Sequence, residues 1–422
     1  MKTARLFRAA ARGAFATGLA ALLAAAAGCS SSTTAPPPPV PPLSRVDLQP
    51  VTDSLHVGDV RYFVATAYDT NDVALSGIQF AWTSTVPGVV SVASTGAATA
   101  TGEGATLVIA SAGGKSDTAY VYVAGTNAGW YGQTSNTARN LYGVYFRPDG
   151  RNGWAVGAQG TVVATSNAGG NWATVTSGST SDLNSVWFTS SSTGWIVGDA
   201  GVVLKSVNGG ATWSRMLNVF ASEHLMCVRF ADENHGWIVG SGGVVIRTAD
   251  GGASWTRIHP TGVTLNSVAF SDTTNGWAVG NSGIILGTHD GGRAWYLVQP
   301  SVTGQALKGA WRTSNEVAWV VGSTGAKLRT AATADSLSWS AGTFGASFDM
   351  RALVFVDANT GYAAGANGGG VVFQTLDGGN VWTQQPANSG QGLNGVWFAD
   401  VLRGWAVGDL GRIVHTSNGG NQ

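Results

Sequence analysis

The sequence has little charge, almost no cysteine and, beyond its first 30 residues, no long hydrophobic run. Charged residues make up 11% of the 422 residues, and 23 basic residues balance 23 acidic ones. A chain with zero formal charge has no overall field that would attract nucleic acid, so a nucleic-acid partner is not expected. Two cysteines, Cys29 and Cys227, are too few for a disulfide framework or a cysteine-built metal site.

The N-terminus has the pattern of an export signal. Four basic residues stand within residues 1–12, and residues 13–27 form an uncharged run that is too short to span a bilayer. The run ends in Ala26-Ala27-Gly28-Cys29, which resembles the lipobox of bacterial lipoproteins. The resemblance implies a lipoprotein signal peptide over residues 1–28 and lipidation of Cys29. An ordinary secretory signal with an incidental cysteine is the alternative.

Residues 29–43 are rich in Ser, Thr and Pro, a composition typical of an extended, semi-rigid tether. No later segment has 18 consecutive apolar residues, so we expect the lipid anchor to be the only contact with the membrane. The expected location is extracytoplasmic, on the bacterial membrane, facing the periplasm or the cell surface.

Residues 44–124 show short alternating segments separated by turn residues, which predicts a β-sandwich. Examples are residues 60–68, 80–84, 89–92, 106–110 and 118–123. The Val57-Gly58-Asp59 entry, the segment around Trp82 and the Gly102-Glu103-Gly104 turn resemble the group 2 bacterial immunoglobulin-like domain. The resemblance implies a spacer or adhesion module. Trp82 is expected in the core of the sandwich.

A unit of about 42 residues repeats through the rest of the chain. A Gly-Trp-x-Val-Gly element recurs with its aromatic residue at Trp154, Trp195, Trp237, Trp277, Trp319, Tyr362 and Trp405. A second series of tryptophans stands at Trp130, Trp172, Trp213, Trp255, Trp295, Trp339 and Trp382. This period fits a four-stranded propeller blade, and no 3.6-residue apolar stripe supports a helical repeat.

The two series are out of phase at the ends of the chain. Trp130 precedes the first Gly-Trp-x-Val-Gly copy, whereas the last copy stops before its own tryptophan. We therefore predict that residues 128–133 supply the outer strand of the blade formed by residues 393–416, which would leave no unpaired edge at the seam. The predicted fold is all-β: an N-terminal Ig-like β-sandwich followed by a seven-bladed β-propeller over residues 126–422, closed by pairing of N- and C-terminal strands.

The turns before the second tryptophan series carry a further motif. Residues 206–213 and 248–255 resemble the Asp-box, S/T-x-D/N-x-G-x-S/T-W, and three other copies follow it closely. We expect a hairpin in which the Asp or Asn side chain accepts backbone N–H groups and glycine takes a positive φ. Calcium or phosphate binding is the alternative, but one carboxylate or amide per turn is too few ligands. No metal and no cofactor are expected.

Taken together, residues 126–422 resemble the seven-bladed propellers of the photosystem II stability/assembly factor-like family. In phototrophs its members assist assembly of a membrane complex and hold a partner on a basic surface. No basic cluster of this chain matches that surface residue by residue. The resemblance therefore implies a binding scaffold, with an assembly or stability factor for an envelope complex as the alternative function.

An enzyme is not expected. Asp-box propellers also resemble sialidases and other glycan hydrolases, but the spacing of the acidic, tyrosine and arginine residues does not converge on a catalytic set. Cys227 aligns with Gly, Ser or Ala in the other repeats, such as Gly143, Ser185 and Ala352, so we interpret it as a small buried thiol. The recurrence of the tryptophans favours packing between blades over a glycan platform.

The topology of a propeller indicates where a binding surface would lie. The connections between blades and the turns after Gly-Trp-x-Val-Gly share one face. We expect this face to bind a protein or glycan partner at the cell envelope, with the protein acting as a monomer. Its candidate residues are Arg139, Asp182, Asp199, Glu223, His224, Arg257, His259, Asp349, Arg351 and Asp409.

Overall fold

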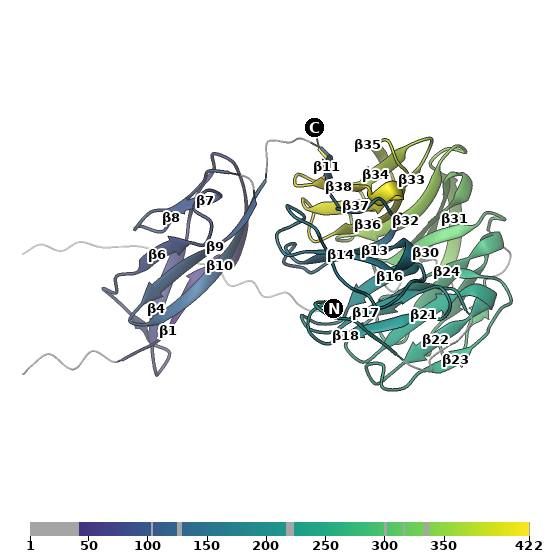
Figure 1. The fold of residues 1–422 in the computed structure, drawn as a ribbon, viewed down its shortest axis with the longest axis horizontal. Coiled ribbons are helices and arrows are strands. Elements are labelled where there is room, and N and C mark those ends of the chain that lie inside the picture. The colour runs from purple at the N-terminus through teal and green to yellow at the C-terminus, as the bar shows by residue number, and fades with distance from the viewer. Residues whose placement is uncertain are drawn as a thin grey trace, which may run out of the picture. The chain divides into compact units, whose positions relative to one another are not determined.

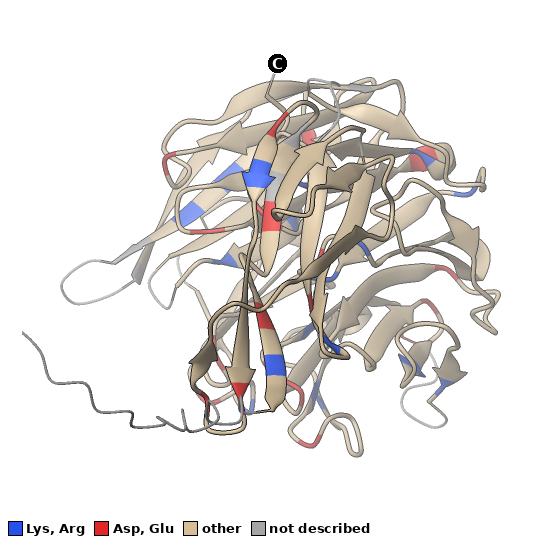
Figure 2. Cartoon of the chain, turned by 90° about the vertical axis from the view of Figure 1, so that its left-hand side faces the viewer, with Lys and Arg blue, Asp and Glu red and all other residues tan. Residues whose placement is uncertain are grey.

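The structure is a computed structural model that describes residues 42–102, 104–124, 129–216, 223–298, 302–314, 317–332 and 337–421. The expected signal peptide, Cys29 and the tether up to residue 41 lie outside the described residues, as does Ala128. Among the described residues, no helix has both the length and the apolar character needed to cross a membrane. Lys and Arg are scattered among Asp and Glu along a mostly uncharged ribbon (Figure 2).

The first ten strands form three sheets between residues 43 and 124 (Figure 1). The strands are β1 (Leu43–Gln49), β2 (Thr52–His56), β3 (Val60–Tyr62), β4 (Val64–Asp69), β5 (Ala74–Leu75), β6 (Ala81–Ser84), β7 (Val90–Val92), β8 (Ala97–Ala100), β9 (Gly104–Ala112) and β10 (Lys115–Ala124). The sheet orders are β1-β4-β5, β2-β10-β9-β6 and β3-β8-β7, and β2 with β10 is a parallel pair.

The residues of these sheets that point inward form one apolar core. Leu48, Val108 and Val121 are completely buried in it, and Trp82 packs against it, as expected. The segment predicted as a single strand over residues 60–68 divides at Phe63, which is 2% exposed. Because β3 pairs with β8 and β4 pairs with β1, the chain changes sheets at this point. The assignment to the immunoglobulin-like family stays a prediction.

The rest of the described chain forms seven four-stranded antiparallel sheets, each named here by its place in the chain. Sheet 1 has β12 (Leu141–Phe146), β13 (Gly153–Gly157), β14 (Thr161–Thr165) and β15 (Ala173–Thr174); sheet 2 has β16 (Leu183–Phe188), β17 (Gly194–Gly198), β18 (Val203–Ser206) and β19 (Ser214–Arg215); sheet 3 has β20 (Leu225–Phe230), β21 (Gly236–Gly240), β22 (Val245–Thr248) and β23 (Thr256–Ile258); sheet 4 has β24 (Leu265–Phe270), β25 (Gly276–Gly280), β26 (Ile285–Thr288) and β27 (Tyr296–Leu297).

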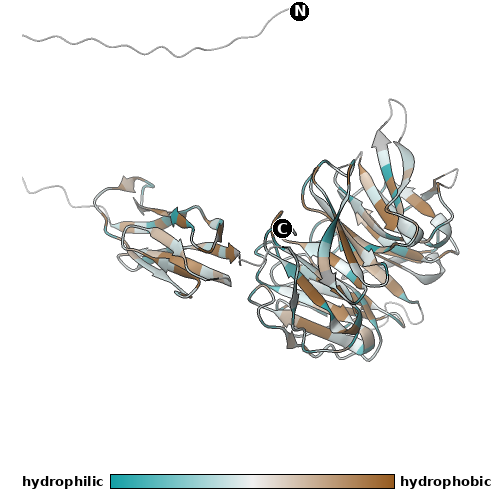
Figure 3. Ribbon diagram, turned by 90° about the horizontal axis from the view of Figure 1, so that it is seen from above, coloured by the Kyte–Doolittle hydropathy of each residue, from teal (hydrophilic) through white to brown (hydrophobic). Residues whose placement is uncertain are grey.

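Sheet 5 has β28 (Leu307–Arg312), β29 (Ala318–Gly322), β30 (Ala326–Ala332) and β31 (Leu337–Thr343); sheet 6 has β32 (Asp349–Phe355), β33 (Gly361–Ala366), β34 (Gly370–Thr375) and β35 (Thr383–Ser389); sheet 7 has β36 (Leu393–Phe398), β37 (Gly404–Gly408), β38 (Ile413–Thr416) and β11 (Tyr131–Gln133). Short 3-10 turns follow the second strands of five sheets: η1 (Ala158–Gly160), η2 (Ser241–Gly243), η3 (Asn281–Gly283), η4 (Ser323–Gly325) and η5 (Asp409–Gly411). Hydrophobic residues concentrate in the strands (Figure 3).

The sheets form a ring. The first strand of each sheet contacts the first strand of the next sheet, and β36 of sheet 7 contacts β12 of sheet 1. This is the arrangement of a β-propeller. The pairing predicted at the seam is confirmed, because β11 pairs with β38 and the Gly129 N–H donates a 2.8 Å hydrogen bond to the Asn421 carbonyl.

The glycines of Gly-Trp-x-Val-Gly are explained by close contacts inside each sheet. A Cβ on the first glycine of sheet 2, Gly194, would stand 2.5 Å from the ring of Phe188. A Cβ on the second glycine, Gly198, would stand 2.1 Å from the Asp182 carbonyl oxygen. The motif is therefore a packing requirement, since larger residues would collide with the first strand.

The aromatic residue between these glycines joins neighbouring sheets. Trp237 of sheet 3 stacks on Phe270 of sheet 4 with ring centroids 3.5 Å apart, and its indole N–H donates to the Gly291 carbonyl. At the seam, Trp405 of sheet 7 stacks on Phe146 of sheet 1 at 3.6 Å. Tryptophans of the second series meet the same phenylalanines edge to face, as Trp172 meets Phe146. The seam thus has the same packing as an internal interface.

The Asp-box turns are hairpins, as predicted. In the copy of sheet 3, the Thr248 hydroxyl donates to Asp250 at 2.7 Å and accepts the Gly252 N–H at 2.9 Å. Gly251 and Gly252 take φ values of +66° and +79°. Hydrogen bonds from the Ser254 side chain and backbone hold the pKa of Asp250 at about 2. Both oxygens of the Asp250 carboxylate therefore accept hydrogen bonds within the turn.

Candidate binding face and axial pocket

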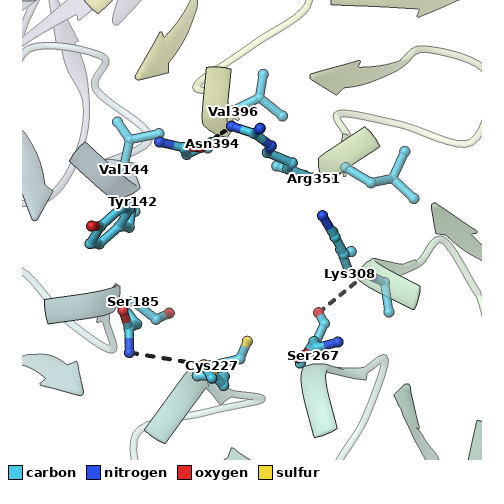
Figure 4. Close-up of a pocket in the computed structure, with 18 of the residues that line it drawn as sticks. Tyr142, Val144, Ser185, Cys227, Ser267, Lys308, Arg351, Asn394 and Val396 are labelled. Atoms are coloured by element: carbon cyan, nitrogen blue, oxygen red, sulfur yellow. Dashed lines mark hydrogen bonds between the residues drawn. The ribbon is translucent and has the colours of Figure 1, made fainter. Parts of the chain in front are cut away.

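A pocket of about 110 Å³ lies on the axis of the ring, where the seven first strands meet (Figure 4). Its wall is a belt of small residues, one from each first strand: Gly143, Ser185, Cys227, Ser267, Gly309, Ala352 and Gly395. A Cβ on Gly143 would stand 3.0 Å from the Asn184 carbonyl oxygen. Cys227 is 5% exposed and packs in the core between sheets 3 and 4. Its size explains its place in this belt.

The two serines of the belt join neighbouring strands. The Ser185 hydroxyl accepts the Val228 N–H at 3.3 Å, and the Ser267 hydroxyl accepts the Ala310 N–H at 3.2 Å. The first strands are therefore held together by hydrogen bonds as well as by close packing. A rigid wall follows, because a shift of one strand would leave these buried groups without partners.

One mouth of the pocket is formed by the residue that precedes each belt position. The seven mouth residues are Tyr142, Asn184, Met226, Asn266, Lys308, Arg351 and Asn394. They depart from the repeat, since the set contains an aromatic residue, a thioether, two cations and three amides. Figure 4 shows the labelled side chains of this set arranged around the central opening of the pocket. This mouth opens on the face where the sequence predicts binding.

The three asparagines of the mouth act as clamps between sheets. The Asn184 side-chain amide donates to Asp199 at 2.9 Å and to the Leu225 carbonyl of the next sheet at 2.9 Å. Asn394 makes the same pair of bonds, to Asp409 and to the Leu141 carbonyl, across the seam. Asn266 repeats the geometry with Asn281 and Leu307. Asp199 and Asp409, both predicted site residues, thus serve partly as structural acceptors.

A charged network spans sheets 5, 6 and 7 at the same mouth. The Lys308 ammonium contacts Asp349 at 2.6 Å, and Arg351 contacts the other oxygen of Asp349 at 3.0 Å. Arg351 also donates to Asn394 at 2.6 Å and lies 3.7 Å from Asp409. Burial opposes ionisation of Asp349, but the hydrogen bonds from Lys308 and Arg351 outweigh it and leave the pKa of Asp349 below its usual value. This carboxyl is an ionised acceptor, not a general acid.

The other predicted residues lie around this mouth in separate groups. Asp182 accepts from the Tyr142 hydroxyl at 3.3 Å and from a backbone N–H at 2.9 Å. His224 lies 3.1 Å from Asp199. Of the ten predicted residues, Arg351 alone lines the axial pocket itself. Glu223 and Arg257 form a 2.8 Å ion pair, Arg139 donates to the Gln159 carbonyl, and His259 is exposed.

Sequence reasoning missed the clamps and the cationic mouth. A signal for the clamps is present, because the three repeats with Asn after the first leucine are the same three that carry Asp or Asn after Gly-Trp-x-Val-Gly. Lys308 also escaped notice, since a lone lysine on a short strand indicates only a solvated side chain. Its position next to Asp349 depends on contact between two sheets, which the sequence of one repeat does not contain.

The opposite end of the pocket is aromatic. Tyr145, Trp187, Trp311 and Trp397, from four first strands, form a chain of ring contacts with centroids 4.7 to 6.0 Å apart. Arg229 lies over the Trp187 ring at 4.8 Å. Burial raises the pKa of Tyr145 to about 12, so its hydroxyl stays protonated at neutral pH. Trp311 and Trp397 line the pocket, and Tyr145 and Trp187 pack against Trp397.

The described residues contain no group of three His, Cys, Asp or Glu side chains that could hold a metal ion. The carboxylates at the mouth are engaged by amides, cations or backbone N–H groups. Among the described residues, this arrangement offers charge and hydrogen bonds for recognition of a ligand.

Comparison with known proteins points to one family and one fold. A family model described as photosynthesis system II assembly factor YCF48 matches residues 123–219 and 216–346, just over half of the chain. The solved structures of "YCF48 bound to D1 peptide" and of YCF48 from Cyanidioschyzon merolae are each 21% identical, with TM-scores of 0.59 and 0.56. They cover 69% and 68% of this chain, and 96% and 98% of their own chains are matched.

A second group of similar structures consists of enzymes. A catalytically inactive variant of virginiamycin B lyase from Staphylococcus aureus with Quinupristin is 10% identical, with a TM-score of 0.56. The match covers 69% of this chain and 99% of the lyase. At this identity the likeness concerns the fold alone. A search of curated proteins gives no match.

Proposed function

The chain belongs to the family of photosynthesis system II assembly factor YCF48, and we propose that it is a non-catalytic assembly or stability factor for a membrane complex of the cell envelope. In this proposal it holds a peptide segment of a partner protein on the face that carries the pocket mouth. A solved family structure has a D1 peptide bound, which supports a protein partner. The proposal does not require that the partner is a photosystem.

The uneven distribution of irregular residues over the two faces of the ring carries this proposal. The face with the mouth holds side chains that differ from sheet to sheet, including the network of Lys308, Asp349 and Arg351. The opposite face holds the Asp-box turns, which repeat the same hydrogen bonds. A regular face is explained by folding alone, whereas an irregular polar face on a regular scaffold is typical of binding.

The same proposal includes the architecture expected from the sequence. The seven sheets are the blades of one closed ring, and residues 44–124 are an Ig-like spacer or adhesion module. Lipidation of Cys29 anchors the protein outside the cytoplasm, and the tether holds its domains away from the membrane. The protein acts as a monomer in this arrangement.

A scaffold for a glycan is the second candidate, and an Asp-box glycan hydrolase is a third. The lyase structures keep catalysis open for this fold. We favour a non-catalytic role because the mouth carboxylates are already hydrogen-bonded and Asp349 is held ionised. A hydrolase needs one carboxyl that stays protonated near neutral pH.

The test is capture of partners from solubilised envelopes of the producing cell, with the full chain as bait. One variant replaces three exposed residues of the proposed face, one arginine and two histidines, by alanine: Arg139, His224 and His259. A protein retained by the parent chain should be lost or clearly reduced with this variant. Conversion of chromogenic glycosides by the parent chain would instead favour the hydrolase.

A matched control changes one arginine and two histidines on the opposite face: Arg293, His235 and His289. These residues follow the first or third strand of their sheets, so they lie at the other end of the ring. The control should retain the partner at the parent level. Equal loss with both variants would contradict the assignment of the face, and equal retention with both would do so as well.

A further inference from the structure

We propose that the axial pocket is a binding site for a carboxylate group, with Arg229 at its inner end as the residue that holds it. The inference does not depend on the proposed function, because it rests on the interior of the ring and not on the exposed face.

The lining of the pocket has charge of one sign. Of the residues that form it, three are basic, namely Arg229, Lys308 and Arg351, and none is acidic. The carboxylates near the mouth approach the two outer cations from outside this lining. Because the two outer cations already contact Asp349 and Asp409, Arg229 is the lining cation left to attract a ligand, and an anion is the matching class.

Arg229 differs from the two outer cations, because the described part of the chain places no acidic partner beside it. Lys308 and Arg351 share Asp349. Arg229 is half-buried, donates one hydrogen bond of 3.0 Å to the Val228 carbonyl and lies over Trp187, and no carboxylate among the described residues comes within 4 Å of it. A guanidinium has five N–H donors in a planar fork that matches the two oxygens of a carboxylate.

A second residue of the pocket lining carries an unpaired donor. Trp397 lines the pocket, and its indole N–H is buried without a hydrogen-bond partner among the described residues. A buried donor without an acceptor costs about 1–3 kcal/mol, so a ligand oxygen that accepts from it gains affinity. In this proposal, one oxygen of the carboxylate accepts from the indole N–H and the other pairs with Arg229.

The shape of the pocket limits how the ligand enters. The wall is the belt of small residues, and Trp311 and Trp397, whose rings contact each other, line the inner end. A pocket of about 110 Å³ with aromatic rings at one end admits a small group that enters from the mouth. Two sources fit this description: a small free carboxylate, or the carboxylate that ends a peptide chain.

Position 229 also permits a clean substitution. The equivalent residue of sheet 4 is Ala269, since Arg229 and Ala269 both pair with the motif tryptophan of their sheet. Sheet 6 has Val354 there. Arg229→Ala and Arg229→Val therefore install residues that the same ring already accommodates, and both variants should fold.

The experiment is fluorine NMR of trifluoroacetate added to the full chain, with trifluoroethanol as a neutral probe of similar size. The trifluoroacetate signal should broaden and recover when acetate is added, while the trifluoroethanol signal stays sharp. Arg229→Ala should weaken binding about tenfold or more, as expected for loss of a charge-assisted pair. Arg215→Ala, on the exposed outer strand β19, should leave binding unchanged.

Competition separates the two sources. A short peptide with a free C-terminal carboxylate that displaces trifluoroacetate, where its C-terminal amide does not, supports a chain end as the ligand. Displacement by acetate alone supports a small free carboxylate. Displacement by inorganic phosphate as readily as by acetate would overturn the carboxylate assignment. Absence of broadening, or equal binding by the parent, Arg229→Ala and Arg229→Val chains, would overturn the site itself.

Discussion

Replacement of Trp405 by alanine tests whether the ring is closed by a full interface. Trp405 is completely buried, stacks on Phe146 of sheet 1 and donates its indole N–H to the Ala168 carbonyl at 3.1 Å. Removal of such a side chain costs about 3–5 kcal/mol. For a domain of this size, that corresponds to a fall in Tm of roughly 6–20 °C. Denaturant unfolding, followed by circular dichroism, measures the change.

The matched control is Trp237→Ala inside the ring. Trp237 is 1% exposed, stacks on Phe270 at 3.5 Å and donates to the Gly291 carbonyl at 2.9 Å, so its environment copies that of Trp405. The two variants should lose similar free energy of unfolding. Double-mutant cycles with the stacked phenylalanines should each give about 0.5–1.5 kcal/mol of coupling. A loss below about 1 kcal/mol for Trp405→Ala, beside a full loss for Trp237→Ala, would refute the closed ring.

Three further predictions concern single residues. Gly198→Ala places a Cβ 2.1 Å from the Asp182 carbonyl and should cost about 1–3 kcal/mol or more in denaturant unfolding, whereas Gly304→Ala, with nothing within 4 Å, should stay within about 0.5 kcal/mol of the parent. Burial lowers the pKa of His415 to about 4, below its ordinary value near 6.5. The free energy of unfolding should therefore fall by about 3 kcal/mol as the pH drops from about 6.5 towards 4. A free energy of unfolding that does not change over this range, or an NMR titration of the His415 ring near 6.5, would contradict this prediction. The Asp250 carboxyl should titrate at about 2, with its stabilising effect present above its ordinary pKa and lost as the pH falls towards 2, and an NMR titration near 4 would show that the turn hydrogen bonds are absent.

The ring was predictable from the repeat, because each sheet packs against its neighbours in the same way and therefore needs the same residues. The glycines of the motif, the small belt residue at Cys227 and the seam strand all follow from features that recur in the sequence. The seam required no more than the observation that Trp130 precedes its sheet. The residues that recur every 42 positions are those that pack neighbouring sheets against one another.

The pocket was not predictable in the same way. Arg229, Lys308 and Trp397 stand more than 70 residues apart in sequence, and they line one space only because the ring brings their strands to a common axis. Arg229 and Lys308 each depart from the residues at the same position of other repeats, and Trp397 shares its position with Trp187 and Trp311, so a search for regularity does not single out any of the three. The sequence of one repeat is enough to predict the fold. The pocket is formed by residues that differ between repeats and that the ring brings together.

The seam has a consequence for biosynthesis. Tyr131 pairs with His415, so the strand that completes the last sheet emerges from the ribosome 284 residues ahead of its partner. Until then β11 has an unpaired edge, and the ring stays open through the translation of six sheets. A nascent chain that stops early cannot close, and it exposes sheet edges that proteases and chaperones recognise. Closure of the ring therefore distinguishes full-length chains from truncated ones, because β11 can pair only after the last sheet has been translated.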